Sequence, residues 1–263
     1  MRLDTTRYEA RQRLRGSIAL TVLLALFSLL IVYLYPSIAE SSANIDALIE
    51  AFPEAVREGF GIEAYSSIEG FLAAELYQFI WILLLGLYMA YTAGGSFAGD
   101  IESKRLYLVL ATPVSRARIA VEKTLALLTP LVLLNLVLPL VVFGSSLAIG
   151  YPVDLLALLT VHLLSLPYHL VCLGIGQVLS VSFSRGNTAQ VGGIATIFLL
   201  FILDSVTVGT DLEWLGDLSP TRYVDTTEIL LHETIHIGDA LLLLAVALFL
   251  LFVSILRFQT RDL

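Results

Sequence analysis

Cysteine is nearly absent from this chain, which has a single Cys172 inside an apolar run. A disulfide framework and a cysteine-based metal site are therefore excluded. Charge is also scarce, because Asp, Glu, Lys and Arg make up 14% of the residues against 57% hydrophobic residues. The G-x-x-x-x-G-K-[ST] pattern, whose backbone amides cradle nucleotide phosphates, does not occur. We therefore expect no catalytic residue and no nucleotide-binding domain in this chain.

The hydrophobic residues gather in runs long enough to cross a bilayer. The mean hydropathy is +0.87, and about 20 consecutive apolar residues suffice for a membrane-spanning helix. The longest polar stretch, residues 36–74, is too short for a core of its own. The sequence therefore predicts an all-α integral membrane protein, with one domain over residues 1–263 and membrane helices at 17–35, 76–97, 116–149, 155–183, 189–208 and 239–256.

Residues 1–16 are rich in arginine. Arg7, Arg11 and Arg15 are four residues apart, so a helix would place them on one face. Such a basic stripe favours anionic lipid headgroups, which predicts a short interfacial helix ahead of the first membrane span. A disordered basic tail is the alternative.

The basic residues also predict the orientation. All Lys and Arg except Arg57 and Arg222 fall on the side of the N-terminus when the six helices are drawn. Because cytoplasmic loops carry the excess of Lys and Arg, we expect both termini and the loop around Lys104 to be cytoplasmic in a plasma-membrane protein. The net charge of -8 comes from acids spread over the outer loops. This pattern is typical of salt-rich habitats such as those of haloarchaea, although ordinary loop acidity is the alternative.

A charged island from Ala98 to Lys123 lies between two apolar runs. Apolar residues at roughly helical spacing predict a short amphipathic helix over residues 100–111, ended by Thr112-Pro113. A second helix is expected to begin at Ser115, whose hydroxyl can cap the free amides of the next turn. The sequence therefore places a short helix at the membrane surface, attached to two membrane helices.

This island resembles the first cytoplasmic loop of ABC-2 type transporter permeases. The C-terminal residues 257–263 also resemble the usual ending of that family. The positions that match the loop are Gly99, Asp100, Ile101, Glu102, Leu106, Leu108, Leu110, Thr112, Pro113, Val114, Ser115, Arg116 and Lys123.

The resemblance implies an ABC-2, type V exporter-like permease fold that works with a separate ABC ATPase subunit. Two ATPase copies, which bind ATP and Mg, would hold two permease protomers, most simply as a homodimer, with the helix at residues 100–111 as a coupling helix. The implied coupling residues are Asp100, Glu102, Arg105, Leu106, Val109, Leu110, Pro113, Ser115 and Arg116. Leu106, Val109 and Leu110 would be the buried anchor against the ATPase, and the charges would form its rim. Nothing in the chain suggests a nucleic-acid partner.

Four polar residues inside predicted membrane helices are candidates for a substrate path: His162, His169, Gln177 and Asp204. Intramembrane polar groups usually face the bundle interior or a cavity. Histidines with a purely structural hydrogen bond are the alternative for His162 and His169. The substrate stays open; the chain also looks somewhat like permeases of nitrous-oxide reductase copper maturation. An ion-coupled secondary transporter is a further alternative, for which His162, His169 and Asp204 are the available ionisable groups.

One motif favours a different class of protein. His232-Glu233-Thr234-Ile235-His236 is a literal H-E-x-x-H, which on a helix can hold Zn between two histidines while the Glu activates water. A third ligand would come from Asp225, Glu228 or Asp239. Such a short pattern also arises by chance, so a zinc metalloprotease is the least favoured alternative, and we expect no metal site.

Overall fold

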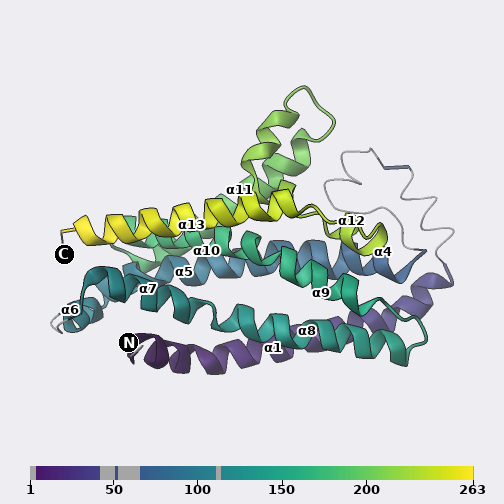
Figure 1. Ribbon diagram of the computed structural model, residues 1–263, viewed down its shortest axis with the longest axis horizontal. Coiled ribbons are helices and arrows are strands. Elements are labelled where there is room, and N and C mark those ends of the chain that lie inside the picture. The colour runs from purple at the N-terminus through teal and green to yellow at the C-terminus, as the bar shows by residue number, and fades with distance from the viewer. Residues whose placement is uncertain (1–3, 42–50, 53–65, 111–113, 263) are drawn as a thin grey trace.

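The long helices lie side by side along one axis in a computed structural model of the chain, which describes residues 4–41, 51–52, 66–110 and 114–262 (Figure 1). Among these residues, six helical stretches are long and apolar enough to cross a membrane: Tyr8–Ala39, Ile68–Glu102, Arg116–Ala148, Leu155–Ser182, Gly186–Thr207 and Ile237–Thr260. The predicted all-α fold with six membrane helices is confirmed. The chain is a multi-pass membrane protein.

Three of the six stretches are each formed by one helix, and the other three by helices joined in line. The single helices are α1 (Asp4–Ala39), α11 (Gly186–Thr207) and α13 (Ile237–Thr260). The second stretch contains α4 (Ile68–Leu72), the π-helix η1 (Ala73–Leu84) and α5 (Leu85–Glu102). The third contains α7 (Arg116–Leu127) and α8 (Thr129–Ala148), and the fourth contains α9 (Leu155–Leu164) and α10 (Leu166–Ser182).

Proline explains two of these joints. Pro130 and Pro167 lie in the first positions of α8 and α10, directly after the breaks at Leu128 and Ser165. Proline has no N–H to donate, and its ring clashes with the preceding turn, so it is tolerated at a helix start and not further in. The span predicted over residues 155–183 is therefore divided into two helices ahead of Pro167. Pro139, by contrast, lies within α8, which continues past it.

The first helix differs from its prediction. Residues 1–16 were expected to form a separate interfacial helix, but α1 runs unbroken from Asp4 to Ala39. Residues 4–16 contain no proline and a single glycine, Gly16, and one glycine costs a helix about 1 kcal/mol. Contacts with α7 offset that cost, since Thr6 donates a hydrogen bond through its hydroxyl to the Glu122 carbonyl at 3.1 Å. The basic segment is therefore the end of the first membrane helix.

Two further helices begin earlier than predicted because a side chain caps them. The second stretch begins at Ile68 rather than residue 76, where the Ser67 hydroxyl accepts a hydrogen bond from the Gly70 N–H at 3.1 Å. Likewise, α11 begins at Gly186 rather than residue 189, and the Gly186 N–H donates to the Glu102 carboxylate at 2.8 Å. A capping group satisfies an amide that the first turn of a helix leaves unpaired.

Glycines let α5 pack tightly between α10 and α11. A Cβ placed on Gly94 would lie 2.7 Å from the Ala189 carbonyl oxygen of α11. Gly176 of α10 lies against the Ala90 carbonyl of α5 so closely that a Cβ would collide with it. Small residues allow this close approach of helix backbones in membranes. Gly94 and Gly176 therefore bring the backbone of α5 close to α11 and α10.

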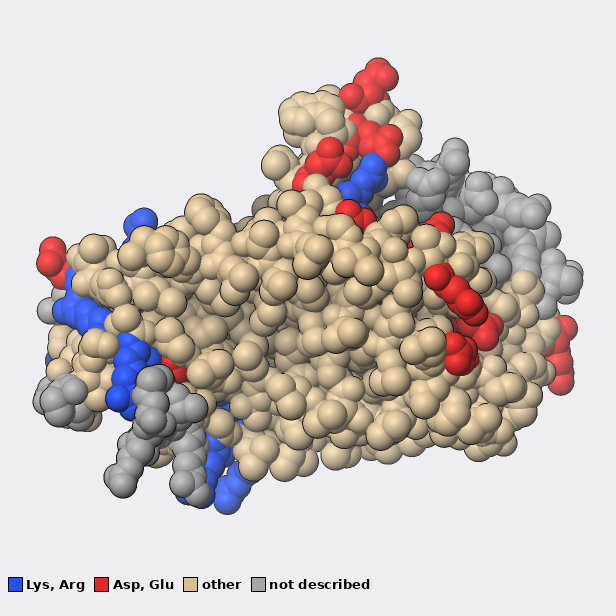
Figure 2. Space-filling view, viewed as in Figure 1, with Lys and Arg blue, Asp and Glu red and all other residues tan. Residues whose placement is uncertain are grey.

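The two ends of the bundle differ in charge. The short helix α6 (Arg105–Leu110) lies at the same end as both described termini, which we call the α6 end (Figure 1). Basic side chains gather there, whereas most acidic side chains on the visible face lie on a protruding segment and at the opposite end (Figure 2). Away from the α6 end, the chain between α11 and α13 forms η2 (Glu213–Leu218), η3 (Pro220–Tyr223) and α12 (Thr226–Leu231).

Candidate functional site

The segment expected to be one coupling helix is divided in two. Asp100 and Glu102 belong to the last turn of α5, which ends at Glu102 with Ser103 as its C-cap, and α6 begins at Arg105. Between them, Lys104 has a φ of 60°, in the left-handed region that non-glycine residues rarely adopt. A left-handed residue after a helix end turns the chain out of the helical path. The prediction of a continuous helix over residues 100–111 is therefore wrong, and Ala111 lies outside the described residues.

Leu106 faces the interior of the protein. It is 1% exposed and belongs to a buried cluster, called here the tip cluster, with Phe97, Ile119, Ala120, Val181 and Phe258. Val109 and Leu110 pack against the same cluster and are partly buried. The exposed apolar residues of α6 are instead Tyr107, at 46%, and Leu108, at 75%. The anchor expected from Leu106, Val109 and Leu110 is thus already largely covered by the chain itself.

The start of α7 agrees with its prediction. The Ser115 hydroxyl accepts a hydrogen bond from the Arg118 N–H at 3.3 Å, which caps the helix that begins at Arg116. Arg116 donates to the backbone carbonyls of Arg261 at 2.6 Å and Gln259 at 3.3 Å. Pro113 lies outside the described residues. The two conspicuous motifs of the sequence, the loop and the C-terminal residues, are therefore in direct contact.

Arg261 fixes the C-terminal residues to the connection between α10 and α11. Its guanidinium donates to the carbonyls of Val181 at 2.7 Å and Phe183 at 3.0 Å, and to the Ser184 hydroxyl at 2.7 Å. Partial burial, together with the nearby Arg257 charge, lowers the pKa of Arg261 below its usual value. An arginine stays protonated in proteins all the same, so these hydrogen bonds remain charge-assisted.

Lys123 of α7 connects its own helix to α5 and α1. Its ammonium is 2.5 Å from a carboxylate oxygen of Asp100 on α5, and it also pairs with Glu9 on α1. A third contact, at 3.3 Å, is with the Ser96 carbonyl. The Lys123 side chain is only 2% exposed, and a buried charge is tolerated where partners of opposite sign surround it. Asp100 was expected at the rim of a docking surface and instead belongs to this internal ion cluster.

Glu102 also has an internal partner. Its carboxylate caps the N-terminus of α11 through Gly186, where the helix dipole favours a negative charge. The α5–α6 turn is thereby attached to α11 as well as to α7. Asp100, Glu102 and Arg116 thus each bond to a different element: α7, α11 and the C-terminal residues.

A family model of ABC-2 family transporter proteins matches residues 6–263. The chain belongs to that family. It is therefore the permease subunit of an ABC transporter, a class of membrane subunit that works with an ABC ATPase. No curated protein sequence matches the chain.

In this ABC-2 permease, two of the four polar residues proposed for a substrate path lie together. His162 and His169 both contact Trp81, with ring centroids 4.2 Å and 5.2 Å from the indole centroid. The Tyr77 hydroxyl lies 3.3 Å from Nε2 of His162. These groups are buried between η1, α9 and α10, so they form a packed internal cluster.

The other two lie elsewhere. Gln177 of α10 exchanges hydrogen bonds with Thr124 of α7 at 2.7 Å and 3.1 Å. Asp204, near the end of α11 away from the α6 end, accepts a hydrogen bond from the Thr221 hydroxyl at 2.7 Å. The structure thus divides the predicted path among three separate sites.

Asp204 belongs to an ion cluster around Arg222. The Arg222 guanidinium pairs with Glu213 and lies 3.8 Å from Asp204 and 3.9 Å from Asp217. The hydrogen bond with Glu213, reinforced by the surrounding carboxylates, raises the pKa of Arg222 above its usual value. Three acids around one base hold η2 and η3 against the end of α11.

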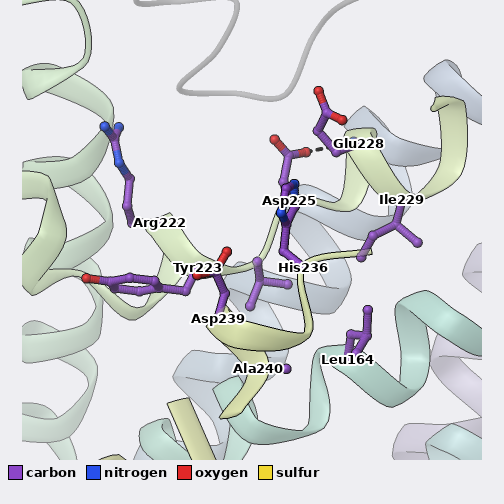
Figure 3. Close-up of a pocket in the computed structure, with 10 residues that line it drawn as sticks. Leu164, Arg222, Tyr223, Asp225, Glu228, Ile229, His236, Asp239 and Ala240 are labelled. Atoms are coloured by element: carbon purple, nitrogen blue, oxygen red, sulfur yellow. Dashed lines mark hydrogen bonds between the residues drawn. The ribbon is translucent and has the colours of Figure 1, made fainter. Parts of the chain in front are cut away.

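The H-E-x-x-H residues do not share one helix. His232 ends α12, Glu233 has a φ of 52°, and His236 directly precedes α13. A zinc site of this type needs both histidines on one helical face. His236 instead lines a cavity of ≈ 180 Å³ together with Asp225, Glu228 and Asp239, while His232 does not line it (Figure 3). Asp225 is committed to capping α12, because it accepts hydrogen bonds from Thr227 and Glu228 at 2.9 Å.

Several residues important in the structure were not singled out from the sequence. Tyr107 and Leu108 could have been found from their apolar character in a helix outside the membrane spans, but their outward direction depends on the turn at Lys104. Glu9 and Trp81 gave no local signal, because their partners Lys123 and His169 are distant in the sequence.

Proposed function

We propose that this permease forms the membrane pathway of an exporter in the plasma membrane, and that a separate ABC ATPase docks on α6 and drives it. The observation that carries the proposal is the exposure of Tyr107 and Leu108 at the basic end of the bundle. Adjoining large apolar residues that are exposed in water can form a patch that marks a protein interface. Leu106 fastens the same helix to the tip cluster, so a force on the exposed pair acts on the membrane helices.

The arrangement of the complex follows from the same proposal. Two permease protomers, most simply two copies of this chain, would work with two ATPase copies that bind ATP and Mg. The basic α6 end, with both termini, faces the cytoplasm, as the distribution of Lys and Arg supports. The acidic residues then face outside, which suits a salt-rich habitat.

Truncation of the exposed pair tests the docking. Tyr107→Ala with Leu108→Ala removes roughly 1.5 to 3 kcal/mol of burial per side chain if the ATPase covers both. The permease is isolated with an affinity tag from its native membranes. The Mg-ATP hydrolysis that co-purifies with the double variant should then be at least about tenfold lower than with the unchanged permease. Leu218→Ala is the matched control, because Leu218 is similarly exposed, at 65%, away from the α6 end.

The choice of residue matters for this test. Leu106→Ala would open the tip cluster, so a loss of ATPase would report a damaged fold rather than a lost interface. The docking proposal is wrong if the double variant retains its ATPase in full. Transport by the purified permease with no ATPase present would favour the ion-coupled alternative instead.

A further inference from the structure

Both ring nitrogens of His169 face backbone carbonyl oxygens. Nδ1 is 2.9 Å from the Ser165 oxygen, and Nε2 is 2.8 Å from the Trp81 oxygen. A carbonyl oxygen only accepts hydrogen bonds, so each of these contacts needs an N–H on the imidazole. A neutral imidazole has one N–H, and an imidazolium has two. The geometry around His169 therefore fits the protonated ring.

The other neighbours of His169 suit a cation as well. Its side chain is fully buried, and the Trp81 and Tyr168 rings each have their centroid 5.2 Å from the imidazole centroid. Aromatic rings at this distance attract a cation, and Trp does so most strongly. Two carbonyl dipoles and two aromatic rings thus take the place of water around the ring, which offsets part of the cost of a buried charge.

His162 provides a second imidazole in the same cluster. Its Nε2 lies beside the Tyr77 hydroxyl, whereas its buried Nδ1 has no hydrogen-bond partner in the described part of the chain. His162 lines a cavity of ≈ 10 Å³ together with Ser28, Tyr77 and Trp81. That volume is about the size needed for one water molecule. A buried ring nitrogen without a partner can give or take a proton through such a water.

We propose that His162 and His169 form a proton-binding site in the membrane core, with the proton held on His169 between Trp81 and Ser165 in the present conformation. The titratable groups that contact the two rings are Tyr77 on η1 and Tyr168 on α10, with Cys172 against Tyr168. In the described residues, no Asp, Glu, Lys or Arg is bonded to either imidazole.

The site links a proton to the packing of the π-helix. The Trp81 carbonyl belongs to η1, and Ser165 occupies the break between α9 and α10. Loss of the proton leaves one N–H for two carbonyl oxygens, so the hydrogen bond from Nε2 to Trp81, which joins α10 to η1, then competes with the one from Nδ1 to Ser165 at the start of α10. The packing of η1 on α10 therefore responds to protonation, with no need for a change in the ATPase. This inference goes beyond the proposed function and does not depend on it.

Trp81 itself reports on the site. The chain has two tryptophans, and the other, Trp214, is exposed and far from the cluster, so Trp214→Phe leaves Trp81 as the only indole. Its fluorescence is then titrated from about pH 4 to about pH 9 in purified protein. We expect one step, with Trp81 quenched on the acid side by the adjacent imidazolium. The step should disappear in His169→Gln and persist in His236→Gln, the control for loss of a distant histidine.

Nitrogen NMR of ¹⁵N-histidine-labelled protein gives a second measurement, which does not require His169→Gln to fold. The chain has four histidines, so His169 is assigned from variants of the other three. Both of its ring nitrogens should carry a proton on the acid side of the step. A fluorescence step that survives in His169→Gln would overturn the proposal, as would a complete absence of any step. A His169 ring with one bare nitrogen over the whole pH range would overturn it too.

Discussion

The ammonium of Lys123 on α7 lies 2.5 Å from a carboxylate oxygen of Asp100 on α5, and Glu9 on α1 pairs with the same ammonium. One side chain thus connects the first membrane helix to both sides of the α6 turn. Asp100 and Lys123 are both among the positions that match the first cytoplasmic loop of ABC-2 permeases. Their contact explains why an acid and a base occur there 23 residues apart.

Replacing Lys123 should therefore destabilise the whole α6 end. Lys123→Met leaves Glu9 and Asp100 without their cation, and we expect the free energy of unfolding to fall by up to about 3 kcal/mol. Thermal unfolding of the detergent-solubilised permease measures the change. Arg13→Gln is the control, because Arg13 pairs with Glu9 at 3.6 Å near the surface and its loss should cost less than about 1 kcal/mol. Equal shifts in both variants would contradict the role given to Lys123.

Glu102 should matter as a helix cap. Glu102→Ala removes the acceptor for the Gly186 N–H, which should cost about 1 kcal/mol and fray the first turn of α11. Glu102→Gln keeps an acceptor and should cost less. Hydrogen exchange of the amides at the start of α11 reports the fraying, with Arg105→Ala as an exposed neighbour that should leave it unchanged. Equal protection in all three variants would rule out the cap.

A methyl group on Gly176 should disturb the packing of α5 on α10. In Gly176→Ala the new Cβ meets the Ala90 carbonyl, and overpacking of this kind costs about 1 to 3 kcal/mol. Gly99→Ala is the matched control, since nothing lies within 4 Å of the position its Cβ would take. The thermal midpoint should fall for the first variant and hold or rise for the second. The reverse order would show that α5 and α10 are further apart than described.

Labelling of single cysteines tests the orientation. With Cys172 replaced, a cysteine at Lys104 should be protected from an impermeant thiol reagent in intact cells, and one at Glu213 should react. Both positions are exposed to solvent in the structure, so the difference reports the side of the membrane. Reaction at position 104 alone would invert the topology.

The H-E-x-x-H residues should bind no metal. His232 and His236 lie on different elements, so purified permease should contain well below one Zn per chain by elemental analysis. His232→Ala should leave the trace content unchanged. Stoichiometric Zn that disappears in this variant, together with a peptidase activity, would support the metalloprotease alternative.

The parts of the fold that were predicted correctly depend on neighbours in the sequence. The six membrane stretches follow from apolar runs, and the cap of α7 follows from Ser115. Each of these signals acts within a few residues. The start of the second membrane stretch was missed although its signal is also local, because the Ser67 cap begins the helix ahead of the polar Glu69 and Glu75.

The coupling segment was predicted less well, because residues distant in the sequence decide which side of α6 is buried. Leu106 points inward because Val181 and Phe258, which lie on α10 and α13, complete the tip cluster. Glu102 was expected to be a rim charge, but Gly186 provides a helix terminus beside it. Hydrophobic spacing shows that a helix has an apolar side; it does not show whether that side is covered by the same chain or by a partner.

The continuity of α1 gives it a mechanical property. At 1.5 Å per residue, its 36 residues form a rod about 54 Å long. Two contacts with α7 hold this rod near its N-terminal end: Lys123 pairs with Glu9, and the Glu122 carbonyl accepts a hydrogen bond from Thr6. If the rod pivoted there, a tilt of about 5° would displace its far end by roughly 5 Å, close to the pitch of one helical turn. A small rotation imposed at the α6 end would thus become a side-chain-sized opening at the opposite end of the bundle.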